Sequence, residues 1–242
     1  MTSLRCLWLV LLLHNGCCIF RLYGQLPDYH VQLFDESEGI RTDVEHVLKD
    51  DLGFIWLTYA EHVQRYDGKQ IHEYSIGDRI NSILKDRDNN IWITSRSQVC
   101  LYKHSQQTFR KVAVEDIENL IIGSAIQMPG QSVWLQTSLG FYTLDSQGLT
   151  FVPVMDEKLK TKTPVNPRRY SSTQSGNTFF YSSGDALWSI DIVSGVQRHL
   201  PAKSLLSMYA LNESKVLVST WTYQTYLYDL HAQTIQIGRA HV

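Results

Sequence analysis

The chain has 242 residues, of which 43% are apolar and 19% are charged, and its formal net charge is −2. This composition supports a folded core and excludes a disordered chain. Lys and Arg form no basic stripe, so the sequence does not favour a nucleic-acid-binding protein. The length allows one large all-β domain or two small ones, and the 13 Tyr and 6 Trp favour strands.

The first residues have the pattern of a targeting segment. Arg5 precedes the apolar run Leu7–Leu13, and the small residue Gly24 precedes Gln25. The run is too short to remain as a membrane anchor, so we expect residues 1–24 to be a signal peptide that is removed on export. Cys17 leaves a lipoprotein site as an alternative.

The cysteines are distributed in a way that agrees with export. Three of them, Cys6, Cys17 and Cys18, lie in the predicted signal peptide, and Cys100 alone remains in the mature chain. The sequence therefore predicts a domain without an intramolecular disulfide. Because Cys100 alternates with apolar neighbours, we expect it to be buried as a small apolar side chain.

An internal repeat runs through the rest of the chain. Residues 44–56 (VEHVLKDDLGFIW) and 80–92 (INSILKDRDNNIW) share alternating apolar residues, then Lys-Asp, a turn, and an apolar pair that ends in Trp. Further copies place Trp134, Phe180 and Leu217 at the position of this Trp. Repeats of about 40 residues are typical of architectures in which each unit buries its apolar faces against its neighbours.

Each unit reads as four short strands. In the first unit, the alternation and the Asp and Gly turn signals predict strands at Val44–Lys49, Phe54–Thr58, Val63–Tyr66 and Ile71–Tyr74. The fold class is therefore all-β, a β-propeller of four-stranded blades with about five blades present, over residues 25–236. Trp56, Trp92 and Trp134 are expected in the core between blades. A weak helical period at Glu115–Ile122 indicates a short helix or a link between the second and third blades.

At these residues the chain resembles the two-component regulator propeller repeat, whose pattern is roughly D-x-x-G-x-[LI]-W-[IVL]-G-T, two residues, and G-[LI]-x-R-[YF]-D. The segment DDLGFIWLTYAEHVQRYDG matches the form typical of a first blade, and the resemblance extends from Val31 to about Asp229. The repeat departs from the pattern where His62 and Gln98 replace the turn glycine that is kept as Gly140. We expect these two residues to be strained by a turn that prefers a positive φ.

The resemblance implies the periplasmic sensor region of a hybrid histidine kinase. Such propellers have seven blades, respond to oligosaccharides released from polysaccharides, and control genes for glycan utilisation. The full-length receptor would be anchored in the inner membrane through a C-terminal region and could form a homodimer. The resemblance implies no catalytic activity in this fragment, no cofactor and no contact with nucleic acid.

Fewer blades are visible than this family form has, so we expect an incomplete propeller. Val31–Phe34 would be the closing strand of the ring. The ending Ile237–Val242 (IGRAHV) resembles the translation of a sequencing adapter, so residues 237–242 are predicted to be a non-native tail after a domain that ends near Gln236.

A propeller gathers the connections between its second and third strands (B–C) and between successive blades (D–A) on one face, where ligands commonly bind. Aromatic rings stack on sugars, and Arg, Glu and Ser bond to hydroxyl groups. On that basis the candidate ligand-binding residues on this face are Tyr59, Glu61, Arg79, Arg96 and Trp221.

Catalytic and metal-binding interpretations find less support. Asp50, Asp51, Asp86 and Asp88 lie in equivalent turns of two units, where Asp caps backbone N–H groups. The histidines show no zinc-ligand spacing, and no nucleophile or phosphate-binding motif is present. Two alternatives to a sensor remain open: a secreted propeller enzyme, such as a lyase or glycosidase, and a non-catalytic interaction scaffold.

Overall fold

The computed structural model describes residues 39–41, 43–128, 133–155, 172–183 and 185–237. These residues form twenty strands and one short 3-10 helix, η2 (Ile117–Asn119), in the link where the helical period was noted. The predicted signal peptide, the predicted closing strand Val31–Phe34 and residues 238–242 lie outside the described residues. Ile237 is described, and pairs with Tyr226 at the end of the last strand.

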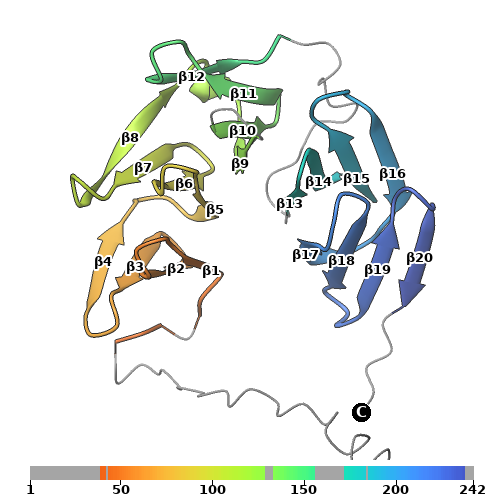
Figure 1. Ribbon diagram of the computed structural model, residues 1–242, viewed down its shortest axis with the longest axis horizontal. Helices are drawn as coiled ribbons and strands as arrows, with labels where there is room; N and C mark the ends of the chain where they lie inside the picture. The colour runs from red at the N-terminus through yellow and green to blue at the C-terminus, as the bar shows by residue number, and fades with distance from the viewer. Residues whose placement is uncertain (1–38, 42, 129–132, 156–171, 184, 238–242) are drawn as a thin grey trace, which may run out of the picture. The chain divides into compact units, whose positions relative to one another are not determined.

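The strands are grouped in chain order into five sets of four, which we call blades one to five. Figure 1 labels them. Blade one contains β1 (His46–Lys49), β2 (Ile55–Tyr59), β3 (His62–Tyr66) and β4 (Ile71–Ser75). Blade two contains β5 (Ile80–Lys85), β6 (Ile91–Ser95), β7 (Val99–Lys103) and β8 (Thr108–Val114). Blade three contains β9 (Ile122–Gln127), β10 (Val133–Thr137), β11 (Gly140–Leu144) and β12 (Thr150–Pro153).

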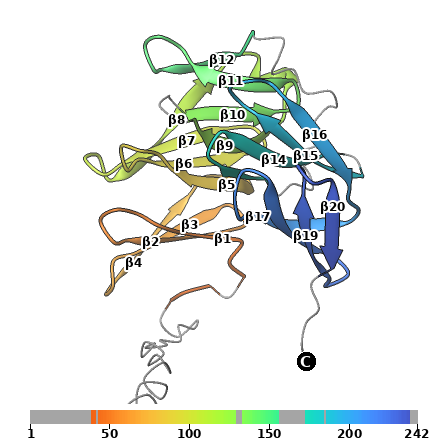
Figure 2. The same cartoon turned by 45° about the vertical axis from the view of Figure 1, so that its right-hand side comes forward.

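Blade four contains β13 (Ser172–Ser175), β14 (Thr178–Ser183), β15 (Ala186–Asp191) and β16 (Gln197–Pro201). Blade five contains β17 (Leu205–Ala210), β18 (Lys215–Thr220), β19 (Thr225–Asp229) and β20 (Thr234–Ile237). Within each blade, consecutive strands pair antiparallel, as Figures 1 and 2 show. The predicted all-β fold of four-stranded blades is confirmed, and the four strands predicted for the first unit agree with β1 to β4 within two residues at each end.

One pairing was not predicted. The outer strands of blades two and three, β8 and β12, run parallel and pair at Ala113 with Thr150 and at Val114 with Phe151. The N–H of Glu115 continues this ladder by donating to the carbonyl of Phe151 at 2.9 Å. Blades two and three therefore share one eight-stranded sheet, whereas the other blades remain four-stranded.

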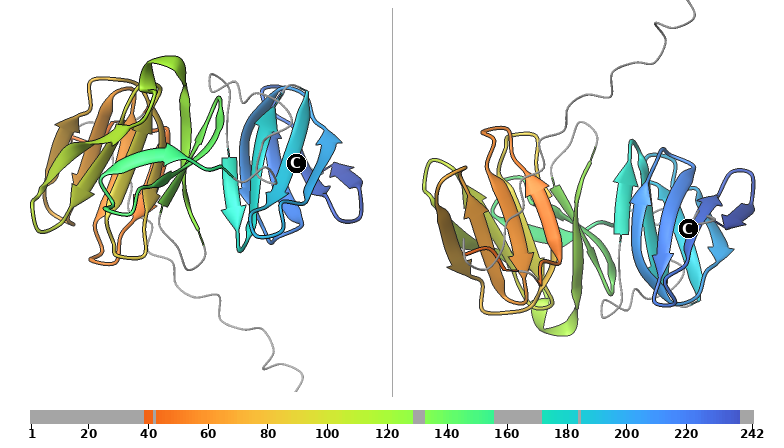
Figure 3. Two further views of the ribbon diagram at one scale, coloured as in Figure 1. Left: turned by 90° about the horizontal axis from the view of Figure 1, so that it is seen from above. Right: turned by 90° about the horizontal axis from the view of Figure 1, so that it is seen from below.

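The core consists of layers between successive blades. Trp56 is fully buried in a cluster with Ile91, Ile93 and Tyr102 of blade two. Trp92 packs in the same way against blade three, and Trp134 against Phe179 of blade four. Figure 3 shows the twist of the blades that form these layers. The prediction that the three indoles fill the core is confirmed.

The last two copies of the repeat differ from each other in burial. Phe180, at the position of the Trp, is fully buried against blade five. Leu217, at the same position in blade five, is 39% exposed. Val216 and Val218 on the same strand face blade four, so Leu217 points away from it. It shares this far face with its strand partners Tyr209 and Leu227.

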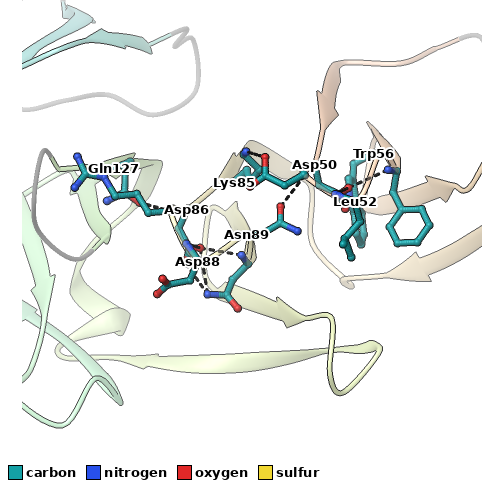
Figure 4. Close-up of polar contacts among 12 residues, drawn as sticks. Asp50, Leu52, Trp56, Lys85, Asp86, Asp88, Asn89 and Gln127 are labelled. Atoms are coloured by element: carbon teal, nitrogen blue, oxygen red, sulfur yellow. Dashed lines mark hydrogen bonds and ion pairs between the residues drawn. The ribbon is translucent and has the colours of Figure 1, made fainter.

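In blades one and two, the turns between the first and second strands (A–B turns) are held by aspartates and by side chains from the next blade. Oδ1 of Asp50 accepts the N–H groups of Leu52 and Phe54, and Asp86 does the same for Asp88 and Asn90. Figure 4 shows how these turns are joined across blades. Oδ1 of Asn89 accepts the N–H of Asp51 at 2.9 Å, and Lys85 forms an ion pair with Asp51. The predicted capping role is thereby confirmed for Asp50 and Asp86, whereas the carboxylate of Asp51 pairs with Lys85.

The prediction that His62 and Gln98 are strained is wrong. Neither residue is among those with positive φ, and the left-handed residue of the B–C turn in blade one is Ala60, with φ 46°. A two-residue loop, Ala60-Glu61, joins the paired residues Tyr59 and His62, so His62 already belongs to an extended strand. Gly140 in blade three does have a positive φ, of 124°.

Candidate ligand-binding face

Backbone hydrogen bonds bring the B–C turns and the D–A links together. The N–H of Ile80 donates to the carbonyl of Ala60 at 2.8 Å, and that of Ile122 donates to Arg96 at 3.1 Å. In blade five, the N–H of Trp221 donates to Ser204 at 2.9 Å. These bonds join a turn to a link in each case, so the B–C turns and the D–A links form a common surface. We call it the B–C face.

Tyr59 lies at the end of β2 rather than in a loop, and only 7% of its surface is exposed. Its hydroxyl donates to Oε2 of Glu73 at 2.7 Å, and its ring stacks on His62 with 5.2 Å between ring centroids. Burial and the bond to Glu73 raise the pKa of Tyr59 to about 12, and the same bond lowers the pKa of Glu73. The alternating pattern of β2 turns this ring inward, so little of it is open to a ligand.

Glu61, Arg79 and Trp221 are exposed. The Glu61 carboxylate lies 3.8 Å from Nε2 of His62, and the guanidinium of Arg79 forms an ion pair with Glu45. Trp221 is 63% exposed at the tip of the B–C turn of blade five. Tyr223, two residues further on, is 95% exposed and has a left-handed φ of 59°.

Among the five candidates, Arg96 lines a pocket. This pocket has a volume of about 600 Å³ and lies at the B–C turn of blade two. Its wall is completed by residues that the sequence analysis did not single out: Gly77, Asp78, Ser97, Gln98, Lys111, Val112, Ala113, Val114 and Ile117. Lys111 was missed because it comes from the outer strand β8, and only the folded blade brings it beside the turn.

The carboxylate of Asp78 is stabilised by hydrogen bonds from Ser95 and Ser97. Its Oδ2 accepts the hydroxyls of Ser97 at 2.7 Å and Ser95 at 3.0 Å, and the N–H of Ser97 at 3.2 Å. Burial alone would raise the pKa of Asp78, but these hydrogen bonds outweigh it and hold the pKa below its usual value. Asp78 is therefore an ionised, hydrogen-bonded support for the turn.

The five candidates do not form one cluster. Within the described residues, no hydrogen bond, ion pair or ring contact joins any two of their side chains. Among those residues there is also no group of three or more His, Cys, Asp or Glu side chains placed to hold a metal ion. No helix in this part of the chain is long and apolar enough to cross a bilayer.

Residues 74–97 match the family model described as two component regulator propeller. The chain carries a two component regulator propeller repeat. The matched residues include the link with Asp78 and Arg79, the turn of Asp86, the buried Trp92, and Arg96. No curated protein matches the chain.

Solved structures share the fold at low sequence identity. The extracellular domain of BT3049 from B. thetaiotaomicron, described as a hybrid two component system, has a TM-score of 0.65 at 15% identity over 85% of this chain. That of BT4673 from the same organism has a TM-score of 0.58 at 13% identity over 87% of the chain. A streptogramin B lyase has a TM-score of 0.60 at 14% identity over 91% of the chain and 74% of its own length.

The chain spans only part of the two extracellular domains, 31% of the BT3049 chain and 39% of the BT4673 chain. At such identities the likeness shows a propeller fold, which these structures place both in extracellular domains and in a lyase. The function must therefore be argued from the B–C face and its repeat.

Proposed function

We propose that this chain is the ligand-reading propeller of an exported hybrid two-component sensor, and that its B–C face binds oligosaccharides released from polysaccharides. The observation that carries the proposal is the repeat match at residues 74–97, which includes the link of Asp78 and the turn of Arg96. The fold shared with two extracellular sensor domains supports it.

The turn at Trp221 suits a ligand such as a sugar ring, whose C–H face can stack on an aromatic side chain. Its backbone is fixed by three hydrogen bonds: Trp221 to Ser204, Tyr223 to Thr220, and Thr220 to Gln224, at 2.9–3.0 Å. The turn thereby presents two exposed aromatic side chains on a rigid support. A preformed support lowers the entropy lost on binding, and aromatic side chains offer large contact areas at a small entropic cost.

Binding to a panel of neutral and acidic oligosaccharides, measured by titration calorimetry with the 242-residue chain, tests this proposal. Trp221→Ala should weaken the binding of an oligosaccharide that interacts with this turn by roughly tenfold, about 1.4 kcal/mol. Leu149→Ala is the matched control, because Leu149 is also exposed, at 53%, but lies away from the B–C turns. It belongs to the turn between the third and fourth strands of blade three (the C–D turn). Binding of no oligosaccharide in the panel would contradict the proposal.

The proposal extends to the receptor of which this chain would be the input. We expect it to act from the periplasm, anchored in the inner membrane, with a histidine kinase whose output is the expression of glycan-utilisation genes. In the source bacterium, deletion of the gene should abolish induction of those genes by the oligosaccharide that binds. Unchanged induction in the deletion strain would contradict this part.

An enzyme is the second candidate, and the fold shared with a streptogramin B lyase favours it. A lyase or glycosidase would convert the sugar that it binds, whereas a sensor would release it unchanged. Mass spectrometry of each oligosaccharide after prolonged incubation with the chain separates the two. We expect unchanged masses; new products that depend on the chain would favour the enzyme.

A further inference from the structure

The pocket at the B–C turn of blade two has an unusual balance of charge. The cations Arg96 and Lys111 both line it, and both are exposed. Neither side chain forms a hydrogen bond or an ion pair within the described residues. Asp78 is the single acidic residue of the wall, and its Oδ2 already accepts three hydrogen bonds from Ser95 and Ser97.

The other polar side chain of the turn is also engaged. Nε2 of Gln98 donates to the carbonyl of Ile76 at 2.7 Å, which ties the turn to the link from blade one. The pocket therefore offers a ligand two cationic groups on a fixed frame. The remaining wall includes the apolar residues Val112, Val114 and Ile117.

We propose that this pocket binds the anionic group of an acidic oligosaccharide, a carboxylate or a sulfate ester, between Arg96 and Lys111. The inference rests on the proposed function and narrows its ligand class. A guanidinium binds a carboxylate or sulfate through two parallel N–H···O bonds, and such charge-assisted bonds are about twice as strong as neutral ones. The apolar wall would contact the C–H groups of the sugar ring.

Titration calorimetry of the 242-residue chain with three probes tests the inference. Trigalacturonate carries carboxylates, neocarrabiose 4-sulfate carries a sulfate ester without a carboxylate, and cellotriose is neutral. At least one charged probe should bind ten or more times more tightly than cellotriose, and its affinity should fall as NaCl is raised from 20 to 300 mM. The preferred probe identifies the anionic group.

Two variants locate the site. Arg96→Gln and Lys111→Gln should each weaken binding of the preferred probe about tenfold and reduce its salt dependence. Lys203→Gln, which removes an exposed cation of a D–A link outside the pocket wall, should change the affinity less than twofold. Circular dichroism verifies that every variant is folded.

The outcomes separate this inference from the proposed function. Binding of cellotriose as tight as that of both charged probes would overturn the inference and leave the proposed function standing. Tight binding of a charged probe that Arg96→Gln and Lys111→Gln leave unaltered would also overturn it, because the site would lie elsewhere. If none of the three probes binds and no sugar in the wider panel binds, both the inference and the proposed function are overturned.

Discussion

The indole Nε1 of Trp92 donates a 2.7 Å hydrogen bond to Oδ2 of Asp86, which lies six residues earlier at the start of the A–B turn. Trp56 and Asp50 form the equivalent bond at 2.8 Å. In blade three the equivalent position is Met128, and the buried Nε1 of Trp134 has no hydrogen-bond partner among the described residues. The aspartate of the repeat thus has two roles, since it caps its turn and also satisfies the indole between blades.

This difference predicts unequal effects of the same substitution. Trp92→Phe and Trp134→Phe each replace a buried indole with a smaller phenyl ring, but only Trp92→Phe also breaks a hydrogen bond to a carboxylate. We expect Trp92→Phe to lower the free energy of unfolding by about 1–3 kcal/mol more than Trp134→Phe does. Urea unfolding followed by circular dichroism measures both, and equal losses would contradict the role of Asp86.

Asn89 allows its backbone and side-chain roles to be separated. Its φ of 60° is left-handed, and its side chain accepts the N–H of Asp51 from blade one. Asn89→Gly keeps the backbone conformation accessible and removes only the contact, whereas Asn89→Ala also strains the turn. We expect Asn89→Ala to cost about 1 kcal/mol more stability than Asn89→Gly, because a left-handed conformation is unfavourable for Ala.

Chemical unfolding of the two variants, with the wild-type chain as reference, measures this difference. A smaller loss for Asn89→Ala than for Asn89→Gly would contradict the assigned backbone strain.

The C–D turns predict a loss of stability in acid. Oδ1 of Asp145 accepts the N–H of Leu149 at 2.9 Å, and this bond holds the pKa of Asp145 below its usual value. The N–H groups of Gln70 and Lys69 lower the pKa of Asp67 in the same way. The pKa of each carboxyl is therefore lower in the folded chain than in the unfolded chain. The stabilisation is complete above the unfolded-state pKa of about 3.9, and it is lost as the pH falls through the folded-state pKa.

Asp145→Asn should therefore destabilise the chain at pH 7 and have a progressively smaller effect below about pH 4. Thermal unfolding midpoints between pH 2.5 and 7 measure this trend. Lys103 lies at the equivalent position in blade two and carries no carboxylate. Lys103→Gln is therefore the control whose effect should not follow the same titration; a loss for Asp145→Asn that is constant with pH would contradict the prediction.

Cys100 should be unreactive in the folded chain. It is 4% exposed, and burial raises the pKa of its thiol. Because the thiolate is the reactive form, a thiol reagent at pH 8 should label Cys100 slowly in the folded chain. The labelling rate should rise strongly in denaturant. Replacing Cys6, Cys17 and Cys18 with Ser makes the measurement specific, and fast labelling under native conditions would contradict the burial.

The sequence predicted the repeated layers well because they depend on local signals. Alternation located the strands of blade one, and the spacing of Trp56, Trp92 and Trp134 identified the core between blades. The aspartates of the A–B turns were also recognised, although the hydrogen bond from Asp86 to the indole six residues later was not. That bond follows from the hairpin geometry that joins β5 to β6.

Features that depend on how the strands are arranged within a folded blade could not be predicted in this way. Tyr59 was assigned to a loop because the family pattern places its turn there, but the two-residue loop in blade one begins at Ala60. The pocket at Arg96 needs Lys111, fifteen residues later in the chain, on the outer strand of the same blade. Neither position has a distinctive local signal.

The parallel pairing of β8 with β12 affects how the protein could be divided by recombination. A crossover between blades two and three, at residues 115–121, would replace one side of a hydrogen-bonded ladder and leave the edge of β8 or β12 exposed. Such exposed edges promote aggregation of chimaeras. Module exchange is better placed at the junction between blades one and two, where no described strand of one blade pairs with a strand of the other.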